Sequence, residues 1–157
     1  MKLSPAAEFA VRGALVLAEN YGNGPTTLDA ICEARGMSRQ YLVKIFASLN
    51  RAGLITPVRG KLGGYLLARD PDSINVRELI EAVEGPLALN YCQHDPPQCD
   101  RVECALRVIW ADIQQYVGNK LENTTLGQCL QAGQSALDDG SNCPDPDRRR
   151  IYGNSSD

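Results

Sequence analysis

The stretch that decides the fold is residues 54–68, which read Leu54-Ile-Thr-Pro-Val58-Arg59-Gly-Lys-Leu-Gly-Gly64-Tyr65-Leu-Leu-Ala68. Two short apolar runs flank a turn that is rich in glycine. Glycine permits a tight hairpin turn and lets the backbone approach another surface closely. Arg59 and Lys61 lie on this turn, where their cations can reach a minor groove or follow a track of phosphates. The stretch therefore predicts a basic β-hairpin. The alternative is an ordinary hairpin with incidental charges.

The residues before the hairpin predict a helix-turn-helix. Thr27 can cap a short helix that ends at Gly36, and Ser38 can cap a longer helix with a helical apolar period to Leu49. A short helix, a tight turn and a longer helix form the helix-turn-helix pattern. The second helix begins with side chains suited to base edges and phosphates, namely Ser38, Arg39, Gln40, Tyr41 and Lys44. Alone, these fit a solvated helix end equally well, but the basic hairpin that follows favours a winged helix.

Further helices are expected on both sides of this unit. Ser4-Pro5 is a helix start, because the hydroxyl can cap and proline fits the first helical position. Asn75 can cap another helix over residues 76–83. We therefore predict a mainly α fold with a small β-hairpin wing (class α+β), with a winged helix-turn-helix DNA-binding domain over residues 1–84.

The charge distribution agrees with a nucleic-acid partner. The 157-residue chain has a net charge of −3, but residues 1–69 hold nine basic and four acidic side chains, a net charge of +5. Such asymmetry is expected if the first part faces a polyanion. The composition is typical of a soluble globular protein, and no apolar run approaches the roughly 20 residues that cross a bilayer. The N-terminus makes a poor signal peptide, so we predict a cytoplasmic protein with reduced thiols and no membrane partner.

A cysteine-rich segment follows the predicted domain and reads Cys92-Gln-His-Asp-Pro-Pro-Gln-Cys99-Asp-Arg-Val-Glu-Cys104. Clustered soft thiolates select zinc, copper(I) or iron–sulfur clusters. The paired Cys-x-x-Cys signature of structural zinc is missing, although His94 could complete a zinc tetrahedron. Cys32 lies on the apolar side of a helix and is expected in the core. Cys129 and Cys143 have no obvious partner.

A long amphipathic helix is predicted after the cysteines. From Val102 its apolar positions recur at helical spacing, at Leu106, Ile109, Ile113, Val117 and Leu121, with Trp110 and Tyr116 beside them. Such a stripe is most simply a dimer contact; its alternative is packing against its own domain. Thr125 can cap a last helix to about Ala132. We therefore predict a ligand-binding loop over residues 85–104, a dimerisation helix region over 105–132 and a disordered tail over 133–157, in which the basic run at residues 148–150 is solvated.

Three motifs carry a resemblance to a known family: Ser38-x-x-Tyr41-Leu42, Arg51-Ala-Gly-Leu54 and Arg59-Gly60-x-x-Gly63-Gly64-Tyr65-x-Leu67. Over about residues 1–130 the chain resembles the winged-helix regulators typified by IscR, NsrR and RirA. The resemblance implies a homodimeric bacterial transcription factor, not an enzyme, that binds double-stranded DNA at a near-palindromic operator. It places Ser38, Arg39 and Gln40 near the major groove, and Arg59 and Lys61 near the minor groove.

The same resemblance implies an iron–sulfur cluster bound by Cys92, Cys99 and Cys104, with [4Fe–4S] favoured over [2Fe–2S]. IscR-like members add a histidine three residues after the last cysteine, but Arg107 occupies that position here. NsrR-like members use a carboxylate from the first helix of the partner subunit, and the matching residue is Glu8. Glu8 also fits an ordinary acid in the first turn of a helix, where the helix dipole favours it. His94 and an exogenous ligand are the competing fourth ligands.

These observations predict a regulator that senses nitric oxide, redox state or iron status through a cluster whose loss changes operator affinity. One alternative is a cluster-free regulator of the same fold that responds to a metabolite or a partner protein. A second alternative is a redox protein that contains zinc or a cluster. The second lacks support, because the chain has no recognisable cofactor motif and His94 is its only histidine.

Overall fold

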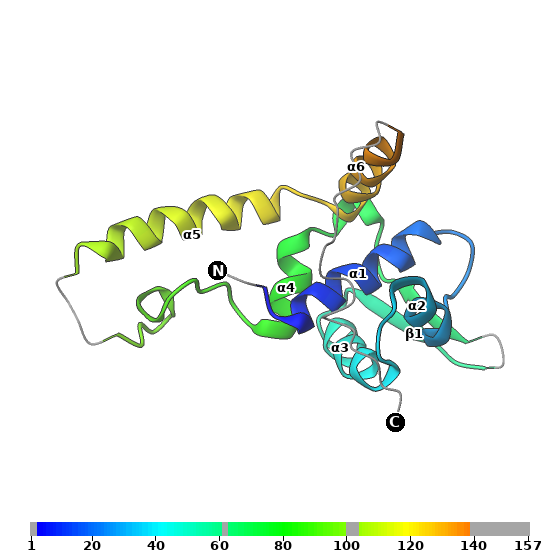
Figure 1. Ribbon diagram of the computed structural model, residues 1–157. Helices are drawn as coiled ribbons and strands as arrows, with labels where there is room; N and C mark the ends of the chain where they lie inside the picture. The colour runs from blue at the N-terminus through cyan, green and yellow to red at the C-terminus, as the bar shows by residue number, and fades with distance from the viewer. Residues whose placement is uncertain (1–2, 61–62, 100–103, 139–157) are drawn as a thin grey trace, which may run out of the picture.

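The computed structural model describes residues 3–60, 63–99 and 104–138 (Figure 1). It confirms the predicted class, a mainly helical fold with one two-stranded antiparallel hairpin. Its elements in chain order are α1 (Pro5–Glu19), α2 (Leu28–Arg35), α3 (Arg39–Arg51), β1 (Ile55–Val58), β2 (Gly64–Leu67), the 3₁₀ turn η1 (Pro71–Ser73), α4 (Val76–Glu84), the 3₁₀ turn η2 (Tyr91–Gln93), α5 (Leu106–Glu122) and α6 (Leu126–Asp138). Among the described residues, no helix is long and apolar enough to cross a bilayer.

The helices begin where short polar side chains can satisfy free backbone N–H groups. The Ser4 hydroxyl accepts a hydrogen bond from Ala7 N at 3.2 Å, and the Thr27 hydroxyl accepts one from Ala30 N at 3.2 Å. Asn75 and Glu78 form a reciprocal capping box at the start of α4. Ser38 occupies the N-cap position of α3, but its hydroxyl makes no capping bond. The predicted helix starts are therefore confirmed. At α3 the predicted residue stands at the N-cap position, but its side chain does not cap the helix.

The core lies where α1 crosses α3 and α4. Phe46 and Leu42 of α3 and Ile31 of α2 are fully buried beneath α1. Gly13 makes the close crossing possible, because a Cβ atom there would lie 2.7 Å from Cε1 of Phe46. Burial of large apolar side chains contributes roughly 1.5–3 kcal/mol each. This core fixes the orientation of α3, the predicted recognition helix.

The hairpin is fastened to the helix-turn-helix by Tyr65. Its backbone exchanges two hydrogen bonds with Thr26, at 3.0 and 2.9 Å, so the segment before α2 forms an isolated bridge to β2. Its ring meets Phe46 edge-on with centroids 4.9 Å apart. Gly64 is required for this approach, since a Cβ atom there would lie 2.4 Å from the carbonyl oxygen of Thr26. The wing is therefore held at a set position relative to α3.

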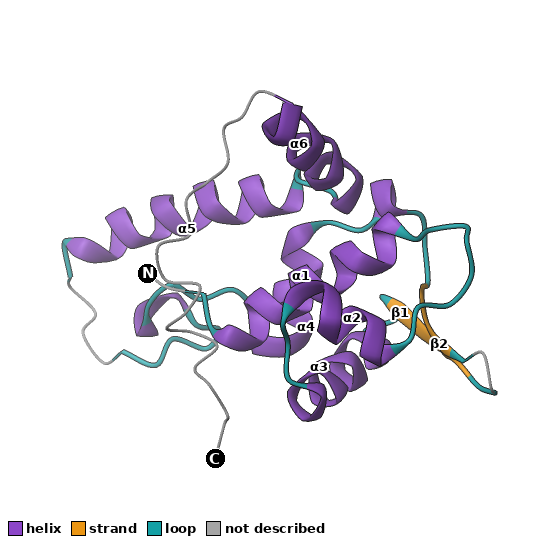
Figure 2. Ribbon diagram, turned by 45° about the vertical axis from the view of Figure 1, so that its right-hand side comes forward, coloured by secondary structure: helices purple, strands orange, loops and turns teal. Residues whose placement is uncertain are grey.

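The C-terminal helices behave differently from each other. The cysteine loop and α5 extend from one side of the winged domain, and the hairpin extends from the other (Figures 1 and 2). By contrast, α6 returns to pack on α1, with Leu126 fully buried. Thr125 and Gln128 cap α6 reciprocally at 3.1 Å, as expected for Thr125.

The extent of these helices differs from the prediction in two places. The helix α6 ends at Asp138 and not near Ala132, because Gly133 lies inside it at an energetic cost of only about 1 kcal/mol. The helix α5 begins at Leu106, and the predicted start at Val102 lies outside the described residues. The predicted tail from residue 139 onward, including the arginine run, lies outside them as well.

Candidate DNA interface and cysteine loop

The start of α3 presents polar side chains to solvent. Leu42, Ile45, Phe46 and Leu49 bury one face of the helix, so the opposite face is exposed. Gln40 and Lys44 are four residues apart on that exposed face, and Ser38 is exposed at the N-cap position of the helix. Their hydroxyl, amide and ammonium groups are the types that contact base edges and phosphates. The structure thus leaves these three predicted residues accessible at the N-terminal end of α3.

Tyr41 takes a different position. Its side chain is half-buried, and its ring packs edge-on against Phe9 with centroids 5.4 Å apart. The ring therefore joins α3 to α1, a contact that the sequence analysis missed. The periodicity offers a signal for it, because Tyr41 is adjacent to the buried Leu42 and four residues before Ile45.

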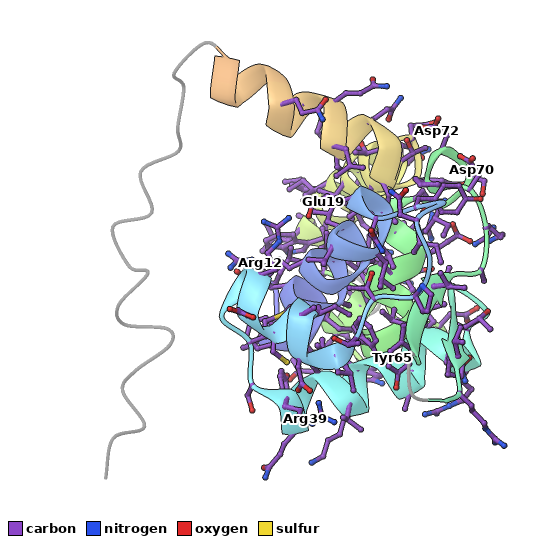
Figure 3. The ribbon with its side chains drawn as sticks, turned by 90° about the vertical axis from the view of Figure 1, so that its right-hand side faces the viewer. Arg12, Glu19, Arg39, Tyr65, Asp70 and Asp72 are labelled. Atoms are coloured by element: carbon purple, nitrogen blue, oxygen red, sulfur yellow. The ribbon has the colours of Figure 1, made fainter. Side chains whose placement is uncertain are left out.

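Arg39 is exposed, and its guanidinium forms an ion pair with Asp29 at the start of α2. Figure 3 shows Arg39 at the end of the molecule opposite Asp70 and Asp72. Asp29 and Arg39 both line a cleft of about 330 Å³ between the helix-turn-helix and the wing, together with Thr27, Leu28, Pro57, Val58, Gly63, Gly64 and Tyr65. The sequence analysis counted Asp29 only as one acid among the basic residues.

On the wing, Arg59 directly follows β1 and is exposed. Lys61 lies outside the described residues. Arg59 is therefore the predicted wing cation that the structure places, and its accessibility suits a contact with the DNA backbone.

The cysteine loop is folded back on itself and tied to α5. The backbone N–H of Gln98 donates to the carbonyl of Tyr91 at 2.9 Å, which brings the residues before Cys99 and Cys92 together. The Gln93 amide donates to Cys92 Sγ at 3.4 Å and to the Arg107 carbonyl at 3.3 Å. Cys92 therefore lies next to the first turn of α5, which Cys104 precedes.

The three loop cysteines are half-buried free thiols. Three soft thiolates match the ligand preference of iron–sulfur clusters, so the donor set fits such a group. Within the ranges described, however, no three side chains of His, Cys, Asp or Glu are close enough together to hold a metal ion. Residues 100–103, which connect Cys99 to Cys104, lie outside those ranges. The three sulfur ligands therefore lie on one loop, but in the described residues they are not close enough together to bind one metal ion.

The candidate fourth ligands have separate surroundings in this single chain. Glu8 is half-buried on α1 and pairs with Arg12 at 2.6 Å. The His94 ring stacks on Tyr91 with centroids 6.4 Å apart, and it lines a cavity of about 390 Å³ that Leu3 also lines. The start of α1 thus lies near the beginning of the loop, and the Ser4 N–H donates to Glu84 at 3.2 Å.

Two other cysteines differ from the loop thiols in their surroundings. Burial raises the pKa of the Cys129 thiol, which packs near Ala7 and Ile80. Burial also raises the pKa of Cys32, and the negative charge of Asp29 adds to this effect while Arg39 opposes it. A raised pKa keeps a thiol protonated at neutral pH and makes it a poor metal ligand. Cys143 lies outside the described residues.

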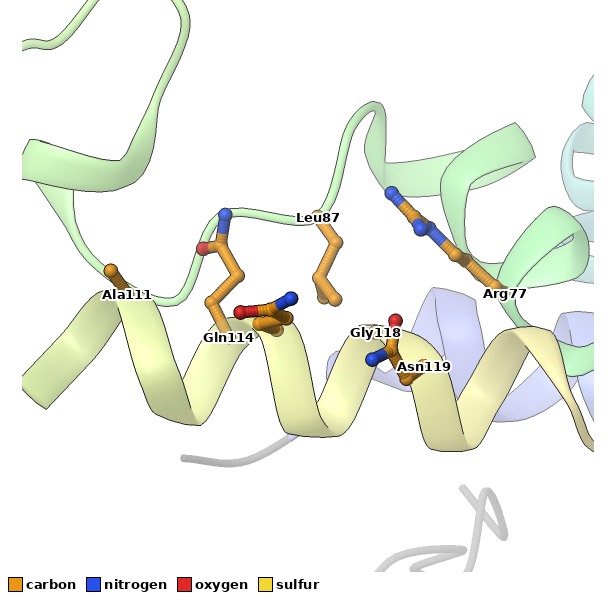
Figure 4. A pocket seen from close by; sticks show the side chains of 7 residues that line it. Arg77, Leu87, Ala111, Gln114, Gly118 and Asn119 are labelled. Atoms are coloured by element: carbon orange, nitrogen blue, oxygen red, sulfur yellow. The ribbon is translucent and has the colours of Figure 1, made fainter.

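A polar joint connects α4 to α5, and the sequence analysis did not find it. Arg77 pairs with Glu81 at 3.0 Å and with Glu122 at 2.9 Å. Glu81 also accepts a hydrogen bond from the N–H of Leu87 at 3.0 Å, and Gln114 accepts one from the N–H of Leu89 at 3.0 Å. Arg77, Leu87 and Gln114 line a cavity of about 210 Å³ together with other residues of α5, namely Ala111, Gln115, Gly118 and Asn119 (Figure 4). The joint links the beginning of the cysteine loop to both helices.

An apolar face of α5 is exposed to solvent. Its members at helical spacing are exposed by 38–75%, namely Leu106, Ile109, Ile113 and Tyr116. Leu106, Ile109 and Ile113 belong to the stripe that the sequence predicts, and Tyr116 lies beside it; within the described part of the chain these four side chains are not covered. Val117 and Leu121, at the other end of the stripe, are half-buried. Exposure of several large apolar side chains on one helix face is typical of a surface that another protein covers.

Comparison with known proteins gives consistent matches. Residues 3–132 match the model of the Rrf2 family, described as an iron-dependent transcriptional regulator. The HTH-type transcriptional regulator IscR of Klebsiella pneumoniae (strain 342) is 36% identical over 138 residues, covering 88% of this chain and 84% of the relative. Among solved structures, CymR, the global cysteine regulator of B. subtilis, aligns with a TM-score of 0.74 at 30% identity, covering 84% of this chain and 98% of that chain. IscR of T. potens aligns with a TM-score of 0.72 at 31% identity, covering 87% of this chain and 90% of that chain.

Proposed function

The chain belongs to the Rrf2 family of transcriptional regulators, and we propose that it is a homodimeric sensor whose cysteine loop controls its affinity for an operator. Family membership makes the chain a DNA-binding transcription regulator and not an enzyme. The proposal adds the ligand of the loop, the assembly and the signal. It rests on one observation above all, that Cys92 is tied through Gln93 to the first turn of α5.

Cys92, Cys99 and Cys104 are the residues that would hold an iron–sulfur cluster. Such a group would supply one iron without a cysteine ligand, open to nitric oxide, oxygen or loss of iron. Glu8 of the partner subunit is the fourth ligand that we favour, with [4Fe–4S] as the favoured type. Glu8 is only half-buried, in the first turns of α1, and Leu3 before that helix lines the same cavity as His94 of the loop, which supports a ligand from α1. Arg107 cannot take this place, because a guanidinium does not ligate iron.

DNA binding is assigned to the opposite side of the molecule. In the proposed complex α3 enters a major groove with Ser38, Arg39, Gln40 and Lys44, while Arg59 and Lys61 of the wing contact the adjacent minor groove. Tyr41 holds α3 against α1 through the contact of its ring with Phe9. Two subunits related by a two-fold axis would place their α3 helices about one helical turn apart on a near-palindromic operator.

The coupling between loop and DNA follows from the position of α5. The cysteine loop and the wing extend from opposite sides of the domain, so neither can contact the other directly within one subunit (Figures 1 and 2). Because the Gln93 amide bonds to the Arg107 carbonyl, a change in the conformation of the loop moves the start of α5. The ion pair of Arg77 with Glu122 holds the end of α5 against α4. If the exposed face of α5 pairs two subunits, its angle sets the distance between their α3 helices. A change in the loop then shifts the population that fits the operator.

The assignment of the DNA surface is tested by Arg59→Ala. Each subunit loses one contact with a DNA phosphate, so a dimer should bind operator DNA at least about tenfold more weakly. The slope of log binding constant against log salt concentration should become shallower by about 1.8. Fluorescence anisotropy over a salt series measures both, and iron and sulfide contents should stay at the wild-type value.

The matched control is Arg69→Ala, which removes another exposed arginine, one that pairs with Glu78 and is adjacent to Asp70. Its operator affinity and salt slope should equal those of the wild type. Equal effects of the two substitutions would mean that the wing cation has no special part in DNA binding.

A further inference from the structure

An ion pair between two exposed side chains lies at the end of the molecule assigned to DNA. Asp29 in the first turn of α2 accepts a hydrogen bond from Nη1 of Arg39, the first residue of α3. We propose that Asp29 is a specificity-determining residue, which positions the Arg39 guanidinium to contact a base edge in preference to a phosphate. This inference rests on the proposed function, in which the start of α3 enters the major groove.

The donor inventory of arginine supports this role. A guanidinium carries five N–H donors in a planar fork. The contact with Asp29 uses Nη1, so the donors on Nη2 and Nε stay available on the other edges of the plane. Two donors are what the O6 and N7 atoms of guanine accept in the major groove. An arginine held at one edge thus keeps the bidentate geometry that distinguishes guanine from the other bases.

The position of the pair agrees with this reading. Both side chains lie at the cleft between the helix-turn-helix and the wing, with Arg39 58% and Asp29 78% exposed. Neither is buried in the fold, so both are accessible to a molecule that docks against α3 and the hairpin. Arg39 also lies at the end of the molecule farthest from the acidic Asp70 and Asp72 (Figure 3).

A purely structural role explains the pair less well. Exposed ion pairs add little to folding stability. A carboxylate on a surface that faces phosphates also weakens binding to every DNA sequence through repulsion. A residue that lowers general affinity is expected on such a surface if it improves discrimination between sequences. In this proposal Asp29 lowers the affinity for all DNA sequences and increases the difference in affinity between the operator and other sequences.

The test uses the full chain and selection from a pool of duplexes of about 30 base pairs with a randomised centre, long enough for two half-sites. Affinities are then measured for the selected duplex, for its variants at each base pair and for unrelated duplex DNA. With Asp29→Asn, Arg39 is free to contact phosphate. We expect about tenfold less discrimination at one base pair per half-site. We also expect tighter binding to unrelated DNA, with a salt slope steeper by about 0.9 for each phosphate gained.

Two comparisons make the result decisive. Glu19→Gln breaks a similar exposed ion pair, with Arg35, and should leave discrimination unchanged. In an Arg39→Ala background, Asp29→Asn should have no further effect on discrimination, because the residue that it positions is gone. Equal losses for specific and unrelated DNA, or a full effect of Asp29→Asn without Arg39, would overturn the proposal. If Arg39→Ala and Arg59→Ala both leave DNA binding intact, the assignment of the DNA surface itself is wrong.

Discussion

Cys92→Ala protein, purified without oxygen, is expected to be colourless and to contain at least about tenfold less iron and sulfide than the wild type. Cys92 is one of three thiols available on the loop, and its sulfur accepts the Gln93 hydrogen bond that leads to α5. The substitution removes one of the three proposed cluster ligands and the sulfur that accepts a hydrogen bond from Gln93, whose amide also donates to the Arg107 carbonyl of α5. Iron and sulfide counts with an absorption spectrum provide the measurement.

The matched control is Cys129→Ala, which removes a thiol that burial keeps protonated and that packs against α1 and α4. It should retain the wild-type spectrum. Glu8→Ala separates the candidate fourth ligands, because a changed spectrum or faster cluster loss supports Glu8 over His94 and an exogenous ligand. A fully coloured Cys92→Ala protein would contradict the assignment of the loop.

The paired substitution Ile109→Glu and Ile113→Glu is expected to convert the protein to monomers at micromolar concentration. Ile109 and Ile113 are exposed by 53% and 38% on the apolar face of α5. Each buried isoleucine contributes roughly 1.5–3 kcal/mol, and a two-fold interface loses each one twice. The dimer dissociation constant should therefore rise by at least about 100-fold. Sedimentation velocity measures the change, and circular dichroism verifies that the monomer is folded.

Val108→Glu is the control for this effect. Val108 is 67% exposed on the same helix, but by helical spacing it faces away from the apolar stripe. Its sedimentation should match that of the wild type. A wild type that is already a monomer would contradict the proposed dimer. Equal dissociation by Val108→Glu would mean that the dimer surface is not this face of α5.

The positions of the helices and of the hairpin could be predicted from short stretches of sequence. Ser4, Thr27, Asn75 and Thr125 mark helix starts because capping depends on residues three positions apart. The glycines of the wing mark the hairpin for a similar local reason, and Gly64 has the further task of admitting the Thr26 backbone. The exposed polar face of α3 followed from its helical period.

Contacts between distant segments could not be predicted in this way. Arg77 and Glu122 are 45 residues apart, and their ion pair depends on how α5 lies against α4. The pair of Asp29 and Arg39 depends on the turn at Gly36, and the packing of Tyr41 on Phe9 depends on the crossing of α1 and α3. The sequence predicts that the last helix ends near Ala132, yet α6 continues through Gly133 to Asp138, because a single glycine weakens a helix without ending it. The cysteine donors were visible in the sequence, whereas their arrangement depends on the tertiary structure around the loop.

If the state of the cysteine loop sets operator affinity, removing the bound metal must change that affinity. Protein purified without oxygen is divided, the metal is removed from one half with a chelator, and both halves are titrated against the same selected duplex. We expect one coloured and one colourless sample, and their dissociation constants for the duplex should differ by about 5- to 150-fold, the usual range of allosteric coupling. A colourless, iron-free preparation with normal DNA binding, or equal affinities for the two halves, would contradict this expectation and favour a cluster-free regulator that responds to a metabolite or a partner protein.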